Sequence, residues 1–207
     1  MTARLLQPGA ATLLAVLAAM PGLALAHHYM DNQLPGTLMQ GLLSGIAHPL
    51  IGIDHAAFIV ASGLLLARVP RGWWAIASLV TGSLVGAILH LNGASLPSGE
   101  LAVAASVILI GVLVVLEPRI GAQFAAAMLL AAGVLHGYAY AETIVGAETT
   151  PLLAYLAGFS AIQFLVCAAA SGCYRIVMRH SPGRARFIGA TAGAAAMAIG
   201  VGFLVGT

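Results

Sequence analysis

The chain has 207 residues, of which 61% are hydrophobic and only 7% are charged, and its formal net charge is +2. Its mean hydropathy of +1.02 lies far above that of an ordinary soluble domain, which excludes a water-soluble globular protein. All eight basic residues are arginines, so the chain has no lysine for a retinal Schiff base or for lysine-based catalysis. We therefore expect an integral membrane protein.

The first 26 residues have the pattern of a cleaved signal peptide. A short basic segment ends at Arg4, an apolar stretch follows at 11–19, and Pro21-Gly22 precedes Ala24-Leu25-Ala26. Such an A-x-A sequence is typical of a cleavage site. The alternative is an uncleaved first transmembrane helix, although the apolar stretch is short for a span. We predict a signal peptide at 1–26 and a single transmembrane domain at 27–207.

Six apolar runs after residue 26 are long enough to cross about 30 Å of hydrocarbon. They lie at about 37–67, 73–91, 100–117, 120–141, 151–177 and 185–206. Turn-forming and charged residues separate them, including a break at 179–186. The predicted fold class is all-α, a polytopic membrane bundle of six transmembrane helices after the signal peptide.

The arginines indicate how the spans are oriented. Arginines follow the first, third and fifth spans, at Arg68, Arg71, Arg119, Arg175, Arg179, Arg184 and Arg186, whereas the opposite loops carry Asp31, Glu100, Glu142 and Glu148. Positively charged loops of membrane proteins remain in the cytoplasm. We therefore expect a bacterial cytoplasmic (inner) membrane protein whose mature N-terminus is extracytoplasmic.

Glycine pairs four residues apart occur in several spans. They are Gly41 with Gly45, Gly82 with Gly86, and Gly189 with Gly193. This spacing favours close approach of helix backbones in a bilayer. The alternative is that glycine is simply abundant, since the chain has 25 copies.

Six of the seven histidines fall on the predicted extracytoplasmic side, together with two carboxylates. They are His27 and His28 at the mature N-terminus, His48 and His55 with Asp54 in the first span, His90 ending the second, and His136 with Glu142 ending the fourth. Imidazole and carboxylate bind divalent transition metals, so this bias indicates a metal path. A solvated or hydrogen-bonded role would explain each histidine alone, and His27 and His28 fit a capture site and a disordered end equally well.

The segment from His48 to His55, HPLIGIDH, holds the central motif. On a regular helix these two histidines share a face but stand about 10 Å apart along the axis, too far for one ion at about 2 Å from each nitrogen. Either there are two sequential sites or the helix is broken. Pro49 and Gly52 favour a break, a feature of many transporters. Asp54 is then a ligand, an acceptor for the ring N–H of a ligating histidine, or a protonated buried acid.

A weaker pattern repeats this motif three spans later. Gly45-x-x-His48 is followed by Asp54, and Gly133-x-x-His136 is followed by Glu142, with five residues between histidine and acid in each copy. The two copies would run in opposite directions across the membrane. This is what an inverted three-plus-three repeat requires.

The motif His48-Pro49-x-x-Gly52-x-Asp54-His55 resembles the signature of the HupE/UreJ family of nickel and cobalt permeases. The resemblance extends to Leu96-Pro97-x-x-Glu100 and to the segment from Leu135 to Glu142, although this segment has fewer histidines than the family pattern. It implies a cleaved signal peptide, six helices, and secondary uptake of Ni²⁺ or Co²⁺ for metalloenzymes such as urease or hydrogenase. It marks His48, Asp54 and His55 as the selectivity motif, with His136 and Glu142 as further candidates.

Two other classes of protein fit the histidines less well. A b-type haem protein would use paired transmembrane histidines as axial ligands, and an intramembrane zinc hydrolase would need an H-E-x-x-H motif that the sequence lacks. No phosphate-binding G-x-x-x-x-G-K-[ST] occurs either, so an ATPase in this chain does not drive transport. We predict a permease without enzymatic activity or a tightly bound cofactor, whose partners are a divalent metal ion and the bilayer, not nucleic acid. The sequence leaves open the metal preference, the energy coupling and the oligomeric state.

Overall fold

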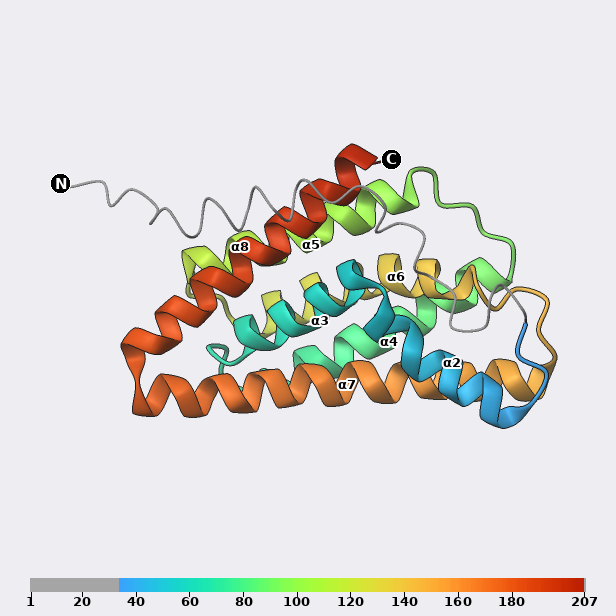
Figure 1. The fold of residues 1–207 in the computed structure, drawn as a ribbon, viewed down its shortest axis with the longest axis horizontal. Coiled ribbons are helices and arrows are strands. Elements are labelled where there is room, and N and C mark those ends of the chain that lie inside the picture. The colour runs from blue at the N-terminus through green and yellow to red at the C-terminus, as the bar shows by residue number, and fades with distance from the viewer. Residues whose placement is uncertain (1–33, 207) are drawn as a thin grey trace.

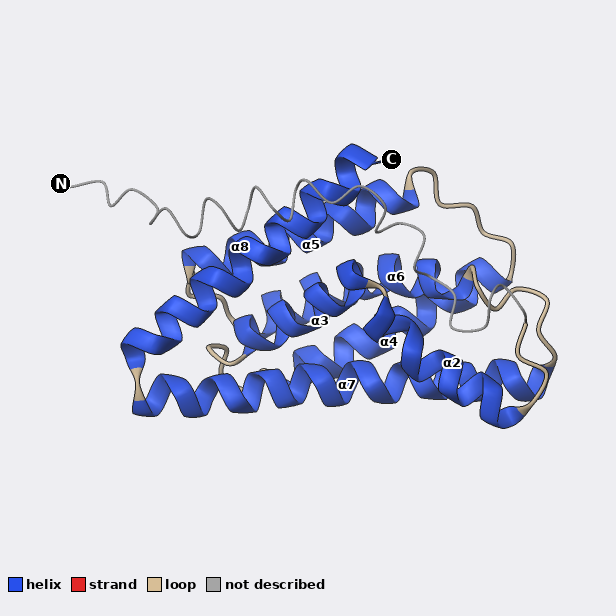
Figure 2. Ribbon diagram, viewed as in Figure 1, coloured by secondary structure: helices blue, strands red, loops and turns tan. Residues whose placement is uncertain are grey.

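The computed structural model describes residues 34–206, and every regular element in this range is a helix (Figure 2). The helices are α2 (Leu38–Ile51), α3 (Ile53–Leu66), α4 (Trp73–Leu91), α5 (Gly99–Leu116), α6 (Ala122–Ala141), α7 (Thr149–His180) and α8 (Pro182–Gly206). The predicted all-α fold is confirmed. The predicted signal peptide at 1–26, together with His27 and His28, lies outside the described residues.

Five of these helices, α4 to α8, are long and apolar enough to cross a membrane. The pair α2 and α3 passes the same test when taken together, but a bend of 77° separates the two helices. Counting this bent pair as one span gives six, as the apolar runs predicted. The protein is a multi-pass membrane protein.

The contacts along α7 show that α2 and α3 together form one broken span. A Cβ atom added at Gly41 in α2 would collide with the carbonyl of Pro151, near the start of α7. At the other end, the Arg175 Nε donates to the carbonyl of Ala67, just beyond α3, at 3.1 Å. Pro151 and Arg175 are roughly 36 Å apart along α7 at about 1.5 Å per residue, which exceeds the hydrocarbon thickness of about 30 Å. The chain therefore crosses the bilayer beside α7, and Figure 1 shows this course.

Local sequence explains where the broken span begins and where it bends. Thr37 and Gln40 form a reciprocal capping box at the start of α2. Pro49 lies inside α2 and has no N–H to donate to the preceding turn. The helix ends at Gly52, whose φ of −65° and ψ of 104° are extended, and α3 begins at the next residue. The predicted break near Pro49 and Gly52 is confirmed.

Small residues bring three pairs of helices into backbone contact. A Cβ atom at Gly45 in α2 would collide with the Tyr155 carbonyl in α7, and one at Gly86 in α4 would collide with the Val134 carbonyl in α6. In the pair of α5 and α8, a Cβ atom at Gly193 would come too close to the carbonyl of Gly111. The predicted close packing at these glycines is therefore confirmed.

The same three pairs have the geometry of two inverted halves. Contacts at 82 with 130 and 86 with 134 show that α4 and α6 run parallel, and contacts at 41 with 151 and 45 with 155 show the same for α2 and α7. The helices α5 and α8 run antiparallel, since Gly111 meets Gly193 and Gly200 meets Ala104. A twofold axis that exchanges spans one to three with spans four to six would relate the pair of spans two and four to the pair of spans five and one. It would also pair span three with span six in opposite directions. The fold thus supports the predicted inverted repeat.

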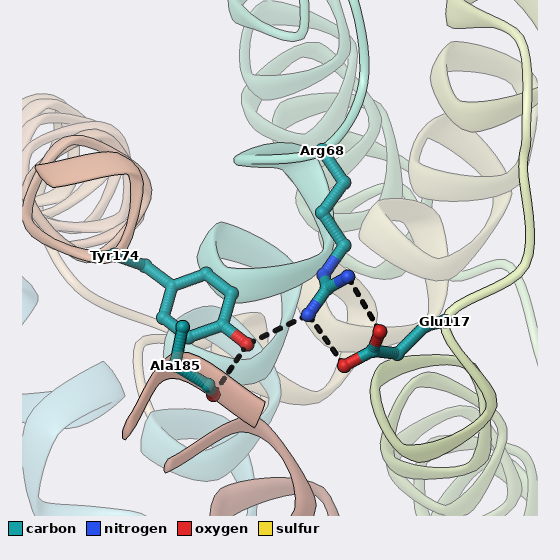
Figure 3. A network of polar contacts seen from close by, with 4 residues as sticks. All are labelled: Arg68, Glu117, Tyr174 and Ala185. Atoms are coloured by element: carbon teal, nitrogen blue, oxygen red, sulfur yellow. Dashed lines mark hydrogen bonds and ion pairs between the residues drawn. The ribbon is translucent and has the colours of Figure 1, made fainter. Parts of the chain in front are cut away.

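A polar network joins the loops at the arginine-rich end of the bundle (Figure 3). The Arg68 guanidinium, between α3 and α4, donates to both carboxylate oxygens of Glu117 at the end of α5, at 2.8 and 2.5 Å. It also donates to the Tyr174 hydroxyl of α7 at 2.9 Å, and this hydroxyl donates to the Ala185 carbonyl of α8 at 2.8 Å. Partial burial opposes the charged form of Arg68, but the hydrogen bonds to Tyr174 and Glu117 outweigh it and raise the pKa above its ordinary value.

A second arginine at this end caps α3. The Arg175 side chain donates to the carbonyls of Leu66 and Ala67 at 3.1 Å each, which satisfies acceptors left over at a helix C-terminus. The junctions after α3, α5 and α7 therefore meet at one end, as the arginine distribution predicted. The predicted break at 179–186 is wrong in extent, because α7 continues to His180 and α8 begins at Pro182. Arginine is a good helix former, and proline suits a first helical turn.

The glycine contacts lead to opposite expectations at two positions. Gly86→Ala should lower the melting temperature of the purified protein, because the new methyl group overlaps the Val134 carbonyl and such overpacking costs roughly 1–3 kcal/mol. Gly172→Ala is the matched control in α7, where a Cβ atom meets nothing within 4 Å, and it should raise the melting temperature slightly because alanine favours helix. Thermal unfolding in detergent measures both, and equal shifts would contradict the packing.

Candidate metal centre

Four of the predicted ligand residues meet where the broken span bends. His48 at the end of α2, Asp54 and His55 at the start of α3, and His136 of α6 are each at most 7% exposed. The ring centroids of His48 and His55 are 5.7 Å apart, and those of His55 and His136 are 5.1 Å apart. The bend therefore brings the two motif histidines much closer than a straight helix would.

Asp54 lies in the first turn of α3, where the positive end of the helix dipole favours a carboxylate. Its Oδ2 is 3.6 Å from the Nδ1 of His55. The other carboxylate oxygen, Oδ1, is buried and has no hydrogen-bond partner. Asp54 thus faces His55 with one oxygen and keeps a second acceptor for another group.

A hydrogen-bond chain couples the proton positions on His136 and His55. The Ser106 hydroxyl has one proton and donates it to the Val103 carbonyl at 2.7 Å. The His136 Nε2 lies 2.9 Å from the same hydroxyl oxygen, and it is the donor in that contact when the Ser106 proton goes to Val103.

A neutral His136 then has an unprotonated Nδ1, which lies 3.0 Å from the Nδ1 of His55. His55 must donate in this contact, so its lone pair is on Nε2. His136 and Ser106 together select the tautomer of His55 that presents Nε2 to a metal ion, the role that outer hydrogen bonds play at many metal sites.

His48 is held in a similar way from the opposite side. Its Nδ1 lies 3.2 Å from the hydroxyl oxygen of Thr143, which donates to the Tyr140 carbonyl at 3.2 Å. When Thr143 donates to that carbonyl, the Nδ1 of His48 is the donor to Thr143 and Nε2 again carries the lone pair. Tyr155 supports this arrangement by donating to the same carbonyl at 2.7 Å.

The arrangement provides nitrogen and oxygen ligands for a divalent transition metal: the Nε2 atoms of His48 and His55 and the carboxylate of Asp54. Within residues 34–206, no three His, Cys, Asp or Glu side chains converge closely enough to hold an ion. Binding at about 2 Å per ligand therefore requires the side chains around the bend to move together. His136 is placed to orient His55, and its coordination of the ion stays a prediction.

Several residues of this site gave no clear signal in the sequence. Ser106 and Thr143 are hydroxyl residues in or beside apolar helices, where such residues are common, and Tyr155 comes from a helix with no candidate ligand. Tyr140 is the exception, because it follows His136 by four residues and so lies on the same helix face. Its ring centroid is 4.6 Å from that of His55 and 5.3 Å from that of His48.

Two further predicted ligands, His90 and Glu142, lie near the C-terminal ends of α4 and α6. His90 is half-buried in the last turn of α4, where its ring packs edge-on against Tyr138 at 4.3 Å. Glu142 is exposed at the end of α6, at the end of the bundle opposite the arginines. His180 lies at the arginine-rich end, with its Nδ1 2.9 Å from the Ile176 carbonyl.

The geometry does not favour His55 and His136 as the two axial ligands of a haem. Two axial histidines must bind iron from opposite faces of a porphyrin, so the macrocycle separates their rings. His55 and His136 instead lie in direct contact, with their Nδ1 atoms 3.0 Å apart, and His136 stacks on Phe58 at 4.0 Å. These rings leave no space for a porphyrin between them.

Comparison with known proteins gives a match over nearly the whole chain. The HupE / UreJ protein family matches residues 14–203. Protein HupE of Rhizobium leguminosarum bv. viciae is 30% identical over 157 residues, which cover 75% of this chain and 77% of that protein. No solved structure matches the chain.

The bend itself provides a test of the site. Gly52→Ala should weaken Ni²⁺ binding about tenfold or more, because a Cβ atom at this position would lie 2.6 Å from Cδ2 of His55 and 3.3 Å from Oδ1 of Asp54. Gly202→Ala is the control, since a Cβ atom there meets nothing within 4 Å. Titration calorimetry on the detergent-solubilised protein measures both affinities. Wild-type affinity in Gly52→Ala would mean that the ion does not use these side chains.

Proposed function

This chain belongs to the HupE/UreJ family, and we propose that it is a secondary transporter that imports Ni²⁺ or Co²⁺ across the cytoplasmic membrane. The cargo binds at His48, Asp54 and His55, and its delivery to the cytoplasm supports maturation of metalloenzymes. The protein acts as a permease and not as an enzyme.

The observation that supports this proposal most directly is the break at Gly52. It places two imidazoles and a carboxylate side by side in the interior of a membrane span, where ionisable residues are costly and commonly functional. Broken helices whose unwound ends face a bound ion are a recurring feature of secondary transporters. The family match adds independent support, since it covers the motif and almost all of the chain.

The proposed direction of transport follows from the asymmetry of the bundle. The arginine-rich junctions lie at one end, and His90 and Glu142 lie towards the other. With the arginines in the cytoplasm, the ion approaches from the extracytoplasmic side past His90 and Glu142, and His27 and His28 act as a first capture site. The cluster at the bend then lies between this approach and the cytoplasm.

The ligand chemistry also links binding to protons. A metal ion binds the unprotonated nitrogen of imidazole, so loading the site excludes protons from the Nε2 atoms of His48 and His55. The hydrogen bonds to Thr143 and His136 keep the remaining ring protons on Nδ1. Protons therefore compete with the metal ion for these nitrogens when the pH falls. The proton gradient then has a direct effect on metal binding at this site.

Alanine at any of the three motif residues tests the proposal. His48→Ala, Asp54→Ala and His55→Ala should each abolish accumulation of labelled Ni²⁺ and Co²⁺ by cells expressing the protein, because each removes one ligand of the ion. Asp54→Asn should have the same effect, since it keeps the shape of the side chain and removes its charge. Uptake of the two metals by the same cells also shows which metal the protein prefers.

His180→Ala is the matched histidine control, because His180 lies at the far end of the bundle and should leave uptake unchanged. Immunoblots of the membrane fraction establish that each variant is inserted to the same level. Normal uptake of both metals in all three alanine variants would refute the proposal, and so would a Soret band in the spectrum of the purified protein.

A further inference from the structure

We propose that Tyr140 determines metal specificity at this site, by accepting a hydrogen bond from a water molecule that stays on the bound ion. This inference rests on the proposed function. It assigns the ion a fourth ligand, an oxygen whose fixed position favours Ni²⁺ over Zn²⁺.

The ring of Tyr140 lies beside all three clustered imidazoles. Its ring centroid lies 4.6 Å from that of His55, 5.3 Å from that of His48 and 6.4 Å from that of His136. Phe159 of α7 supports the ring from another side, with the centroids 5.4 Å apart. The side chain is fully buried, so an ion bound by His48 and His55 lies beside this phenol.

The hydroxyl of Tyr140 differs from the hydroxyls of the other tyrosines that the structure describes. Tyr138, Tyr155 and Tyr174 each donate to a backbone carbonyl, at 3.0, 2.7 and 2.8 Å. The Tyr140 hydroxyl is buried and has no hydrogen-bond partner. A buried polar group without a partner destabilises the folded protein, and a phenylalanine would avoid this cost at the same shape.

A second polar atom of the cluster has the same property. Oδ1 of Asp54 is buried without a partner, although Oδ2 of the same carboxylate faces His55. The cluster therefore contains two oxygens with unmet hydrogen bonds, one from a hydroxyl and one from a carboxylate. They mark a place for a group that both binds the ion and hydrogen-bonds to oxygen. A metal-bound water has both properties, since its lone pair faces the ion and its protons are donors.

This water gives the site a means of selection that its imidazoles and carboxylate lack. Affinity for nitrogen and oxygen ligands rises from Co²⁺ to Ni²⁺ and stays high for Zn²⁺, so binding strength alone separates the metals poorly and geometry must do so. Zn²⁺ favours four tetrahedral ligands, whereas Ni²⁺ in such sites favours square-planar or tetragonal arrangements. Together with His48, Asp54 and His55, this water makes four ligands. Because Tyr140 fixes the position of the water, the four ligands do not rearrange into the tetrahedron that Zn²⁺ favours, whereas the site suits a tetragonal arrangement around Ni²⁺.

The test compares two tyrosine variants in purified full-length protein. Tyr140→Phe removes only the oxygen and should weaken Ni²⁺ binding roughly tenfold relative to Zn²⁺ in titration calorimetry. The absorption of bound Co²⁺ should become more intense, because the water is no longer fixed and the ligands can relax towards a tetrahedral arrangement. The melting temperature should stay the same or rise, since the variant loses a hydroxyl that had no partner.

Tyr174→Phe is the matched control at the arginine-rich end. It loses hydrogen bonds to Arg68 and Ala185, so its melting temperature should fall while its ratio of Ni²⁺ to Zn²⁺ affinity stays at the wild-type value. If Tyr140→Phe keeps the wild-type ratio and Co²⁺ spectrum, the role of Tyr140 is refuted and the proposed function stands. If the wild-type protein binds neither metal, the proposed function fails, and the role of Tyr140 fails with it.

Discussion

In hydrocarbon, a backbone N–H or C=O group without a partner costs several kcal/mol, so a helix breaks at membrane depth only where protein covers the break. Gly52 limits this cost because it serves both helices. Its N–H donates to the His48 carbonyl at 3.1 Å, and its own carbonyl accepts from the Ala56 N–H at 2.8 Å. The site depends on this junction, since any longer break would leave more backbone groups unpaired.

The glycine contacts follow from the same constraint. Because α2 and α3 meet at 77°, neither packs on a neighbour along the full length of the span, and each must gain its contacts over a shorter segment. Gly41 and Gly45 let α2 lie directly on the backbone of α7, and Gly63 does the same for α3 further along that helix. The long, regular α7 thus contacts both halves of the broken span, and Arg175 binds the end of that span at the arginine-rich end of the bundle.

The sequence predicted the spans, the break and the closeness of His48, Asp54 and His55 because each depends on residues near one another in the chain. Apolar length defines a span, and Pro49 with Gly52 limits helix continuity within four residues. The tautomers of His48 and His55 depend instead on Thr143, Ser106 and His136, which only the tertiary structure brings near. The α7 to α8 junction is shorter than predicted for a different reason, since arginines mark a membrane boundary but do not end a helix.

The order in which the helices pair has a consequence for assembly in the membrane. The broken span packs along α7, and α4 packs along α6, so the main interfaces join segments far apart in the chain. Such a bundle has a high contact order for a helical protein. Spans that are inserted early stay exposed to lipid until their partner helices are inserted. His55 gains its orienting partner only when α6 arrives. A chain truncated after α5 would therefore carry the whole segment from His48 to His55 without Thr143 and His136, the partners that orient its histidines.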